Sequence, residues 1–119
     1  MIQLPADALP VLDAAQIKDL RDLDDGAGDV LASIVEVFVT QAVAQIAELK
    51  ALVAAPDLGK VKDLAHGLKG ASGNLGASRL AMVCSGLEAA AKAEDGADLA
   101  AYVAAIDAEF SAARTALAG

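Results

Sequence analysis

Residues 29–54 read DVLASIVEVFVTQAVAQIAELKALVA, and the spacing of their apolar side chains says more about the architecture than any other part of the chain. The apolar positions recur mostly at steps of three and four residues, at Leu31, Ile34, Val35, Phe38, Ala42, Ile46, Leu49 and Val53. This period is that of an amphipathic α-helix, and the pattern is too long for a strand although it contains many β-branched residues. A long helix is therefore predicted over these residues.

A short helix is predicted before this stretch. Residues 1–11, with two prolines, read as an extended lead-in or linker. Asp13 is placed to cap a helix that runs to about Leu23, and Gln16 can close a capping box with it. Residues 24–28, DDGAG, are expected to end this short helix before the long helix begins.

Three more helices are predicted after it. Pro56 ends the long helix, and Asp57 is a suitable cap for a helix that stops near residues 73–76, GNLG. The next two helices are expected over residues 77–93 and 97–117. Their apolar stripes are Leu80, Val83, Cys84, Leu87 and Ala91 in the first, and Leu99, Tyr102, Val103, Ile106, Phe110 and Leu117 in the second.

The predicted fold class is all-α. Four long helices joined by short loops must alternate in direction, which gives an antiparallel four-helix bundle with the additional short N-terminal helix over one end. The composition agrees, because 56% of the 119 residues are hydrophobic and only 3% are aromatic, a balance that suits close-packed helices better than a sheet. Residues 12–119 are expected to form one domain.

Charge and composition exclude several function classes. A formal net charge of −8 argues against nucleic acid and anionic membranes as partners. The single cysteine, Cys84, cannot form an internal disulfide and lies in an apolar stripe, so a reducing compartment and no redox role are expected. One histidine and one cysteine offer no metal site. We expect no signal peptide and no apolar run of the roughly 18 residues that cross a bilayer.

The only histidine, His66, is predicted to lie opposite the apolar stripe of its helix. That stripe consists of Val61, Leu64, Leu68, Ala71 and Leu75. At about 100° per residue, Lys69, Gly70 and Gly73 fall within roughly 60° of His66. The imidazole should therefore face solvent, with a cation one turn away and two residues beside it that lack side chains.

An exposed imidazole next to a lysine suits phosphoryl transfer. Neutral imidazole is a nucleophile near physiological pH, and its attack on a phosphoryl donor gives a phosphoramidate that passes the group onward. Such transfer asks the protein mainly for positioning and for cations near the phosphate oxygens, which Lys69 can supply. The alternative is that His66 and Lys69 are solvated surface residues without a role.

Three glycines inside the same helix add to this pattern. Gly67, Gly70 and Gly73 each cost roughly 0.5 to 1 kcal/mol relative to alanine, which stability alone does not explain. Gly70 and Gly73 share the His66 face and would let the surface of another protein reach the imidazole. Gly67 lies about 100° round the helix, where only helix contact is assigned to it. The alternative is that all three serve packing in the bundle.

The stretch from His66 to Leu80, HGLKGASGNLGASRL, followed by Cys84, Leu87 and Glu88, resembles the signature of histidine-containing phosphotransfer (HPt) domains of bacterial phosphorelays. The signature covers about a fifth of the chain. The five-helix pattern around it agrees over nearly the whole length.

The resemblance implies a role for each matching residue. His66 would be phosphorylated, Lys69 would help to hold the phosphoryl group, and Gly70 would let a receiver domain dock closely. Glu88 matches without an evident role, and an i,i+4 pair with Lys92 would be sufficient reason for it. The remaining matches are assigned to helix packing and helix termination: Ser72, Gly76, Ala77, Leu80, Cys84 and Leu87. Gly67 departs from the family, which often has a polar residue there.

The predicted function is that of a phosphorelay intermediate, in which His66 takes a phosphoryl group from a receiver-domain aspartyl phosphate and gives it to another response-regulator receiver. The sequence has no G-x-x-x-x-G-K-[ST] loop for ATP, so a carrier is expected and not a kinase. No cofactor is expected in this chain. Phosphoryl transfer usually needs a Mg²⁺ ion. The resemblance implies that carboxylates of the receiver domain would bind this ion, because no carboxylates cluster near His66 in the sequence.

The expected partners are receiver domains and a sensor histidine kinase, either as a separate protein or in one chain as a hybrid kinase. The expected compartment is the cytoplasm, including the cytoplasmic side of a membrane-bound hybrid kinase. Three alternatives remain open from the residues: a binding module that carries no phosphate, the phosphoacceptor domain of a chemotaxis-type kinase, and a structural bundle with an incidental histidine.

Overall fold

The computed structural model describes residues 9–23 and 29–118, which form five helices and no strand. They are α1 (Ala14–Asp22), α2 (Asp29–Ala54), α3 (Leu58–Asn74), α4 (Ser78–Lys92) and α5 (Leu99–Ala118). The lead-in expected over residues 1–11 lies largely outside the described residues, and so does the break expected at residues 24–28. The bounds of the four long helices agree with the sequence prediction to within two residues.

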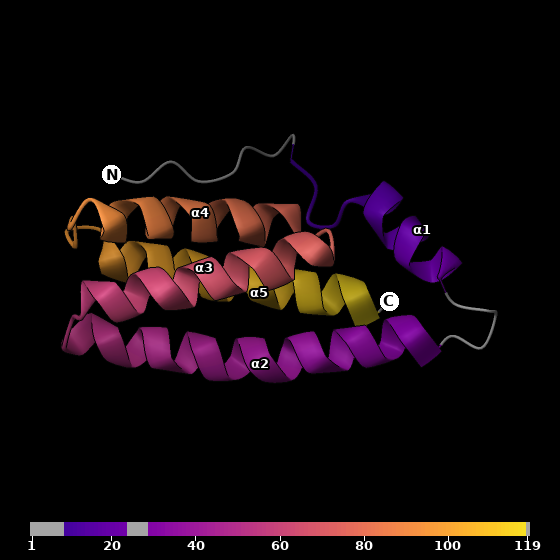
Figure 1. Ribbon diagram of the computed structural model, residues 1–119, viewed down its shortest axis with the longest axis horizontal. Helices are drawn as coiled ribbons and strands as arrows, with labels where there is room; N and C mark the ends of the chain where they lie inside the picture. The colour runs from indigo at the N-terminus through magenta and orange to yellow at the C-terminus, as the bar shows by residue number, and fades with distance from the viewer. Residues whose placement is uncertain (1–8, 24–28, 119) are drawn as a thin grey trace.

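The four long helices lie side by side and alternate in direction (Figure 1). Each packs against two others, in the order α2, α3, α4, α5 and back to α2, and the contact between α3 and α4 is the most extensive. Helix α1 lies at one end of the bundle, near the start of α2. The structure is therefore the antiparallel four-helix bundle with a short N-terminal helix that the sequence predicts.

The core is built almost wholly from aliphatic side chains. Leu49 on α2, Leu68 on α3, Leu80 on α4 and Ile106 on α5 are all fully buried. Phe38 and Phe110 supply the one ring contact found among the described residues, with centroids 5.9 Å apart between α2 and α5. Small residues elsewhere allow the helices to approach closely, which explains how a chain with so few aromatic residues forms a dense core.

Helix α1 is attached to the turn between α3 and α4. The Asp13 carboxylate caps α1 by accepting hydrogen bonds from the backbone N–H groups of Ala15 and Gln16, at 3.0 and 3.3 Å. The predicted capping box is wrong, because the Asp13 N–H donates instead to the Gly76 carbonyl at 2.7 Å. The Gln16 side chain is then free to donate to the Asn74 carbonyl at 3.0 Å. The N-cap and the first turn of α1 thus donate to one carbonyl in the last turn of α3 and to one in the turn that follows it.

The end of α3 is a Schellman motif, as its glycines suggest. The Gly76 N–H donates to the Gly73 carbonyl at 3.0 Å, and the Ala77 N–H donates to the Ser72 carbonyl at 2.8 Å. Gly76 has a φ of +73°, which glycine adopts without steric cost. The start of α3 is also as predicted, because the Asp57 side chain accepts a hydrogen bond from the Lys60 N–H at 3.2 Å.

Helix α2 corrects one expectation from the sequence. In the described part of the chain, Val30–Ala54 is the one helix long and apolar enough to cross a membrane, with a mean hydropathy of 1.8 over an 18-residue window. From the sequence, no apolar run of 18 residues was expected. The helix is nevertheless apolar enough over that length because its polar residues are mostly uncharged. A single such helix is weak support for a membrane span, and here it packs against α3 and α5.

Candidate functional site

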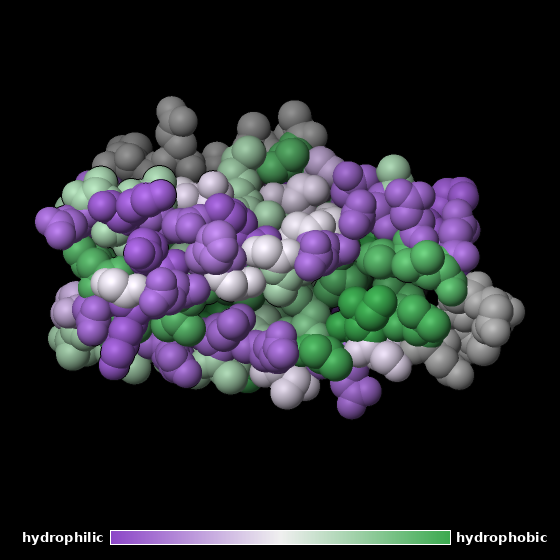
Figure 2. Space-filling view, viewed as in Figure 1, coloured by the Kyte–Doolittle hydropathy of each residue, from purple (hydrophilic) through white to green (hydrophobic). Residues whose placement is uncertain are grey.

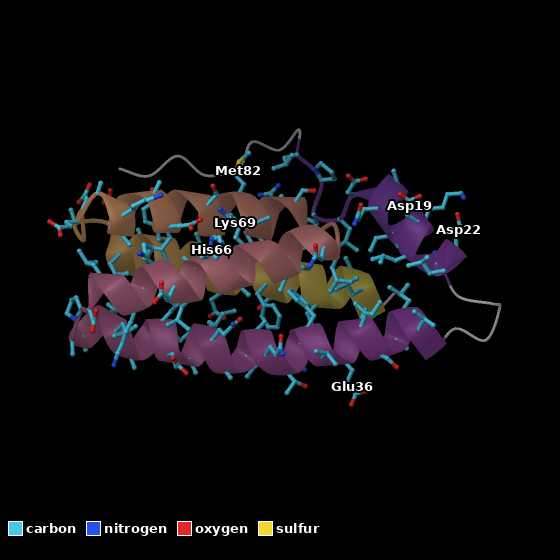
Figure 3. All side chains as sticks on the ribbon, in the orientation of Figure 1. Asp19, Asp22, Glu36, His66, Lys69 and Met82 are labelled. Atoms are coloured by element: carbon cyan, nitrogen blue, oxygen red, sulfur yellow. The ribbon has the colours of Figure 1, made fainter. Side chains whose placement is uncertain are left out.

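His66 lies in the middle of α3 with 69% of its side chain exposed, as its helical position predicts. Lys69, one turn further along, is 36% exposed. Figure 3 shows the two residues next to each other along the edge of α3 that faces α4. The structure therefore brings together the imidazole and the cation that the sequence paired.

The buried stripe of α3 is rotated slightly from the predicted one. Ala65 and Ser72 are fully buried, whereas Leu64 and Ala71 are only partly buried. The Ser72 hydroxyl satisfies itself by donating to the Leu68 carbonyl at 2.6 Å. The rotation follows from the extensive contact with α4, and it turns the His66 edge of α3 toward that helix.

Glu88 of α4 completes the site, and the sequence reasoning did not find its role. One carboxylate oxygen, Oε2, lies 2.7 Å from Nδ1 of His66. The other, Oε1, accepts a hydrogen bond from Nζ of Lys69. Both oxygens are therefore directed at α3, and the predicted pair with Lys92 is wrong.

The Glu88 carboxylate is ionised at neutral pH. The hydrogen bond from Lys69 lowers its pKa most, partial burial opposes that effect, and the hydrogen bond with His66 lowers the pKa further. Only 18% of the Glu88 side chain is exposed. An ionised carboxylate can only accept hydrogen bonds, so Nδ1 of His66 must carry the proton. The lone pair of the neutral ring then sits on Nε2, which is the ring nitrogen with an electron pair available for bonding.

A signal for Glu88 exists in the sequence, but it depends on the register of two helices. Glu88 lies next to Leu87 and one turn after Cys84, at the border of the α4 apolar stripe. A carboxylate at that border faces either solvent or the neighbouring helix. Only the alignment of α3 with α4 shows that it faces His66.

The three glycines of α3 have different surroundings. A Cβ atom added at Gly70 or Gly73 would meet nothing within 4 Å. A Cβ at Gly67 would lie 3.5 Å from the side-chain nitrogen of Gln45 on α2, an ordinary contact. Packing between the helices therefore does not require a glycine at any of these positions. The open space at Gly70 and Gly73 is instead consistent with a need for unobstructed access to His66.

Cys84 lies in the core beneath the site and is unsuited to redox chemistry. Burial raises the pKa of its thiol to about 12, although the charge of Lys69 opposes this. The thiol stays protonated at neutral pH, and the side chain behaves as a small apolar residue. This agrees with the packing role assigned from the sequence.

The face that carries His66 is mostly polar over α3 and α4, and an apolar area lies toward the α1 end (Figure 2). Leu23, just after α1, and Val30, in the first turn of α2, are exposed apolar residues of that end. In the part of the chain that the structure describes, no three His, Cys, Asp or Glu side chains gather closely enough to hold a metal ion.

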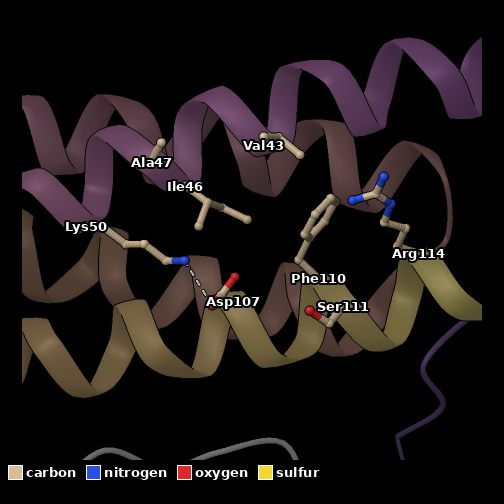
Figure 4. Close-up of a pocket in the computed structure, with 8 residues that line it drawn as sticks. All are labelled: Val43, Ile46, Ala47, Lys50, Asp107, Phe110, Ser111 and Arg114. Carbon is tan, nitrogen blue, oxygen red and sulfur yellow. Dashed lines mark ion pairs between the residues drawn. The ribbon is translucent and has the colours of Figure 1, made fainter.

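A groove of about 290 Å³ lies between α2 and α5, away from His66 (Figure 4). Its walls include Val43, Phe110 and Arg114, and the ion pair between Lys50 and Asp107, with a distance of 3.1 Å, lies within it. None of its residues comes from α3 or α4. The groove is therefore separate from the site on the other helices.

Comparisons with known proteins agree with this arrangement. The family model described as the Hpt domain matches residues 33–116. Among curated proteins, no sequence matches this chain.

Several solved structures are similar over most of the chain. The histidine-containing phosphotransfer protein B (HptB) of Pseudomonas aeruginosa PAO1 is 26% identical, with a TM-score of 0.83 and 91% of each chain covered. The maize histidine-containing phosphotransfer protein ZmHP2 is 28% identical, with a TM-score of 0.82, and covers 91% of this chain and 80% of its own. Saccharomyces cerevisiae Ypd1, solved together with a receiver domain, shares the fold at 18% identity, with a TM-score of 0.72 and coverage of 98% of this chain and 92% of that one.

Proposed function

The chain belongs to the Hpt domain family and is a phosphorelay intermediate, so we propose that His66 is the residue that carries the phosphoryl group. The single observation that carries the proposal is the hydrogen bond between Nδ1 of His66 and Glu88, which leaves the exposed Nε2 as the nucleophile. Lys69 lies beside the ring and provides a positive charge for the phosphoryl oxygens.

The transfer follows from the protonation of the ring. The lone pair of Nε2 attacks the phosphorus atom of an aspartyl phosphate on a receiver domain, a bond forms between nitrogen and phosphorus, and the aspartate carboxylate leaves with the electrons of the broken P–O bond. The proton on Nδ1 stays in place, hydrogen-bonded to Glu88. The reverse attack by an aspartate of a second receiver returns His66 to its starting state.

The expected cofactor is the Mg²⁺ ion of the receiver domain and none of this chain. The carboxylate that contacts His66 is that of Glu88, and both of its oxygens are engaged by His66 and Lys69; no metal-binding group of three His, Cys, Asp or Glu side chains gathers in the described part of the chain. A hard cation such as Mg²⁺ needs several free oxygen ligands. The residues of this site are therefore suited to binding phosphoryl oxygens through hydrogen bonds and charge. They are not suited to binding them through a metal ion held by this chain.

Receiver domains are the proposed partners, docking over Gly70 and Gly73. The open space above both glycines supports this surface. Ypd1, which shares the fold of this chain, was solved in complex with the receiver domain of its downstream response regulator Ssk1. A sensor histidine kinase would feed the relay, in the same chain or apart from it, and the expected compartment is the cytoplasm. The net charge of −8 supports neither nucleic acid nor an anionic membrane as a further partner.

The main alternative is a module that binds receivers without accepting phosphate. Hpt proteins are phosphocarriers and not kinases, and the sequence contains no ATP-binding loop, so neither reading includes a kinase reaction by these residues. The two differ in whether His66 becomes labelled. The pairing of Glu88 with both His66 and Lys69 favours the carrier, because docking alone has no use for a fixed proton on Nδ1.

The test is to incubate the chain with receiver domains carrying radiolabelled aspartyl phosphate. We expect label at one site, with the loss in acid and the stability in base that distinguish a phosphoramidate. His66→Gln should take up no label and keep its helical circular dichroism, because the ring makes no core contact. Label that persists in this variant would refute the assignment of His66, and receiver binding without any label would favour the binding module.

A further inference from the structure

Glu88 is the one described residue that contacts both the reactive ring and the cation beside it. Its Oε2 lies 2.7 Å from Nδ1 of His66, and its Oε1 accepts from Nζ of Lys69. The carboxylate is held against α3 with little exposure. Any change in charge on the ring or in the position of Lys69 must therefore change the interactions of Glu88.

We infer that Glu88 controls how readily phosphorylated His66 releases its phosphoryl group, by holding the proton on Nδ1 and by competing with that group for Lys69. The inference rests on the proposed function. Glu88 acts through the ring and is a positioning residue, because it does not contact the atom Nε2 that carries the phosphoryl group.

The first part of the argument concerns the leaving group. When Nε2 forms its bond to phosphorus, the ring with a proton on Nδ1 becomes positively charged, and a carboxylate at 2.7 Å stabilises that charge. When the N–P bond breaks toward an acceptor, the bonding electrons return to Nε2 and the ring departs as neutral imidazole. If Nδ1 had lost its proton to water, the ring would have to leave as an anion, which is much less favourable. Glu88 therefore keeps phosphohistidine in its transferable form.

The second part concerns Lys69. In the phosphorylated protein its ammonium group is shared between the Glu88 carboxylate and the phosphoryl oxygens. Its interaction with either group weakens its interaction with the other. Without the negative charge of Glu88, Lys69 would pair more fully with the phosphoryl group and stabilise the phosphorylated state. Both effects of Glu88 thus point in the same direction, toward faster release.

The two ends of this ion pair should consequently have opposite effects on the lifetime of phosphohistidine. Loss of the carboxylate at position 88 should lengthen the lifetime. Loss of the ammonium group at position 69 should shorten it, because the phosphoryl group loses its cation and Glu88 interacts with the ring alone. A role limited to holding α3 against α4 would not give opposite signs, because both single variants would break the same contact.

The experiment compares four proteins: the unchanged chain, Glu88→Gln, Lys69→Ala and Glu36→Gln. The last is a matched control that removes the same charge from an exposed position of α2, which points away from His66 (Figure 3). Each protein is labelled by a phosphorylated receiver and then separated from that receiver. Two rates are measured: the loss of label in buffer alone, and the transfer of label to fresh receiver. Circular dichroism establishes that each variant is folded.

We expect Glu88→Gln to slow both forms of loss by about fivefold, since a hydrogen bond to a charged acceptor is stronger than one to a neutral amide. Lys69→Ala should lose label in buffer faster than the unchanged chain. The control Glu36→Gln should lose label at the same rate as the unchanged chain. Nitrogen-15 spectra give an independent readout, and His66 as the only histidine makes the assignment simple. The unchanged chain should show the proton on Nδ1, and Glu88→Gln should show a mixture of the two tautomers.

Equal lifetimes in Glu88→Gln and the unchanged chain would overturn the inference and leave the proposed function intact. So would changes of the same sign in Glu88→Gln and Lys69→Ala, because they indicate a purely structural contact. A ring that carries its proton on Nε2 in the unchanged chain would also overturn it. If the unchanged chain takes up no label at His66, the proposed function itself fails.

Discussion

Gly70 offers the sharpest separation of partner docking from helix packing. A Cβ atom at this position would meet nothing within 4 Å, and the residue is exposed inside α3, one turn after His66. Gly70→Ala should therefore gain nearly the full difference in helix propensity, about 0.8 to 1 kcal/mol. For a domain of this size that gain raises the melting temperature by about 4 °C.

Gly70→Gln should keep the stability and lose the function. Glutamine is also a good helix former, so the variant should melt at or above the temperature of the unchanged protein. Its side chain would stand where the surface of a receiver is proposed to lie, and transfer from a phosphorylated receiver should fall by about tenfold or more, because small displacements of reacting groups are costly. The measurements are thermal unfolding by circular dichroism and the rate of label uptake from the receiver.

Two comparisons make this result interpretable. Ala108→Gln places the same side chain at an exposed position of α5, which packs against α2 and α4, and should leave transfer unchanged. Uptake of phosphate from a small donor such as phosphoramidate should be the same in Gly70→Gln and the unchanged chain, because no partner surface is involved. Unfolding of Gly70→Gln would mean that the glycine serves packing, and unchanged transfer from the receiver would place the docking surface elsewhere.

Two further predictions concern the rest of the domain. Gly76→Ala should lower the free energy of unfolding by about 2 kcal/mol in a denaturant titration, because φ is +73° there and a Cβ would lie 2.9 Å from Cβ of Gln16; a loss under about 0.5 kcal/mol would contradict this account of the turn. Cys84 should resist thiol reagents at pH 8 in the folded protein and react promptly in denaturant, because a pKa of about 12 leaves only about one thiol in ten thousand ionised; rapid labelling of the native chain would show that the core opens there.

The helices of this protein could be predicted closely because their signals are local. Asp13 and Asp57 cap the helices that the sequence assigned to them, and Gly76 ends α3 with the left-handed backbone that glycine allows. The exposure of His66 follows equally from the period of α3 alone. Each of these features depends on residues within one or two helical turns.

The features that could not be predicted depend on how two elements align. Glu88 reaches His66 because α4 lies against α3 in one particular register, and the sequence pattern of α4 does not contain that register. Gln16 bonds to the Asn74 carbonyl instead of closing its own capping box for the same reason. Composition was also an incomplete guide to α2, whose uncharged polar residues let it resemble a membrane helix while it packs in a bundle.

The residues of the proposed phosphotransfer site all belong to one helical hairpin. His66, Lys69 and Glu88 lie on two consecutive helices joined by a short turn, and the contact between these helices is the most extensive in the molecule. Contacts between neighbouring segments close only short loops, so their entropic cost is small and they form rapidly during folding. We expect the α3–α4 hairpin to assemble early, with His66, Lys69 and Glu88 already aligned before α2 and α5 close the bundle. Substitutions in α2 or α5 would then alter mainly how fast the folded protein opens, and the hairpin would set how fast it forms.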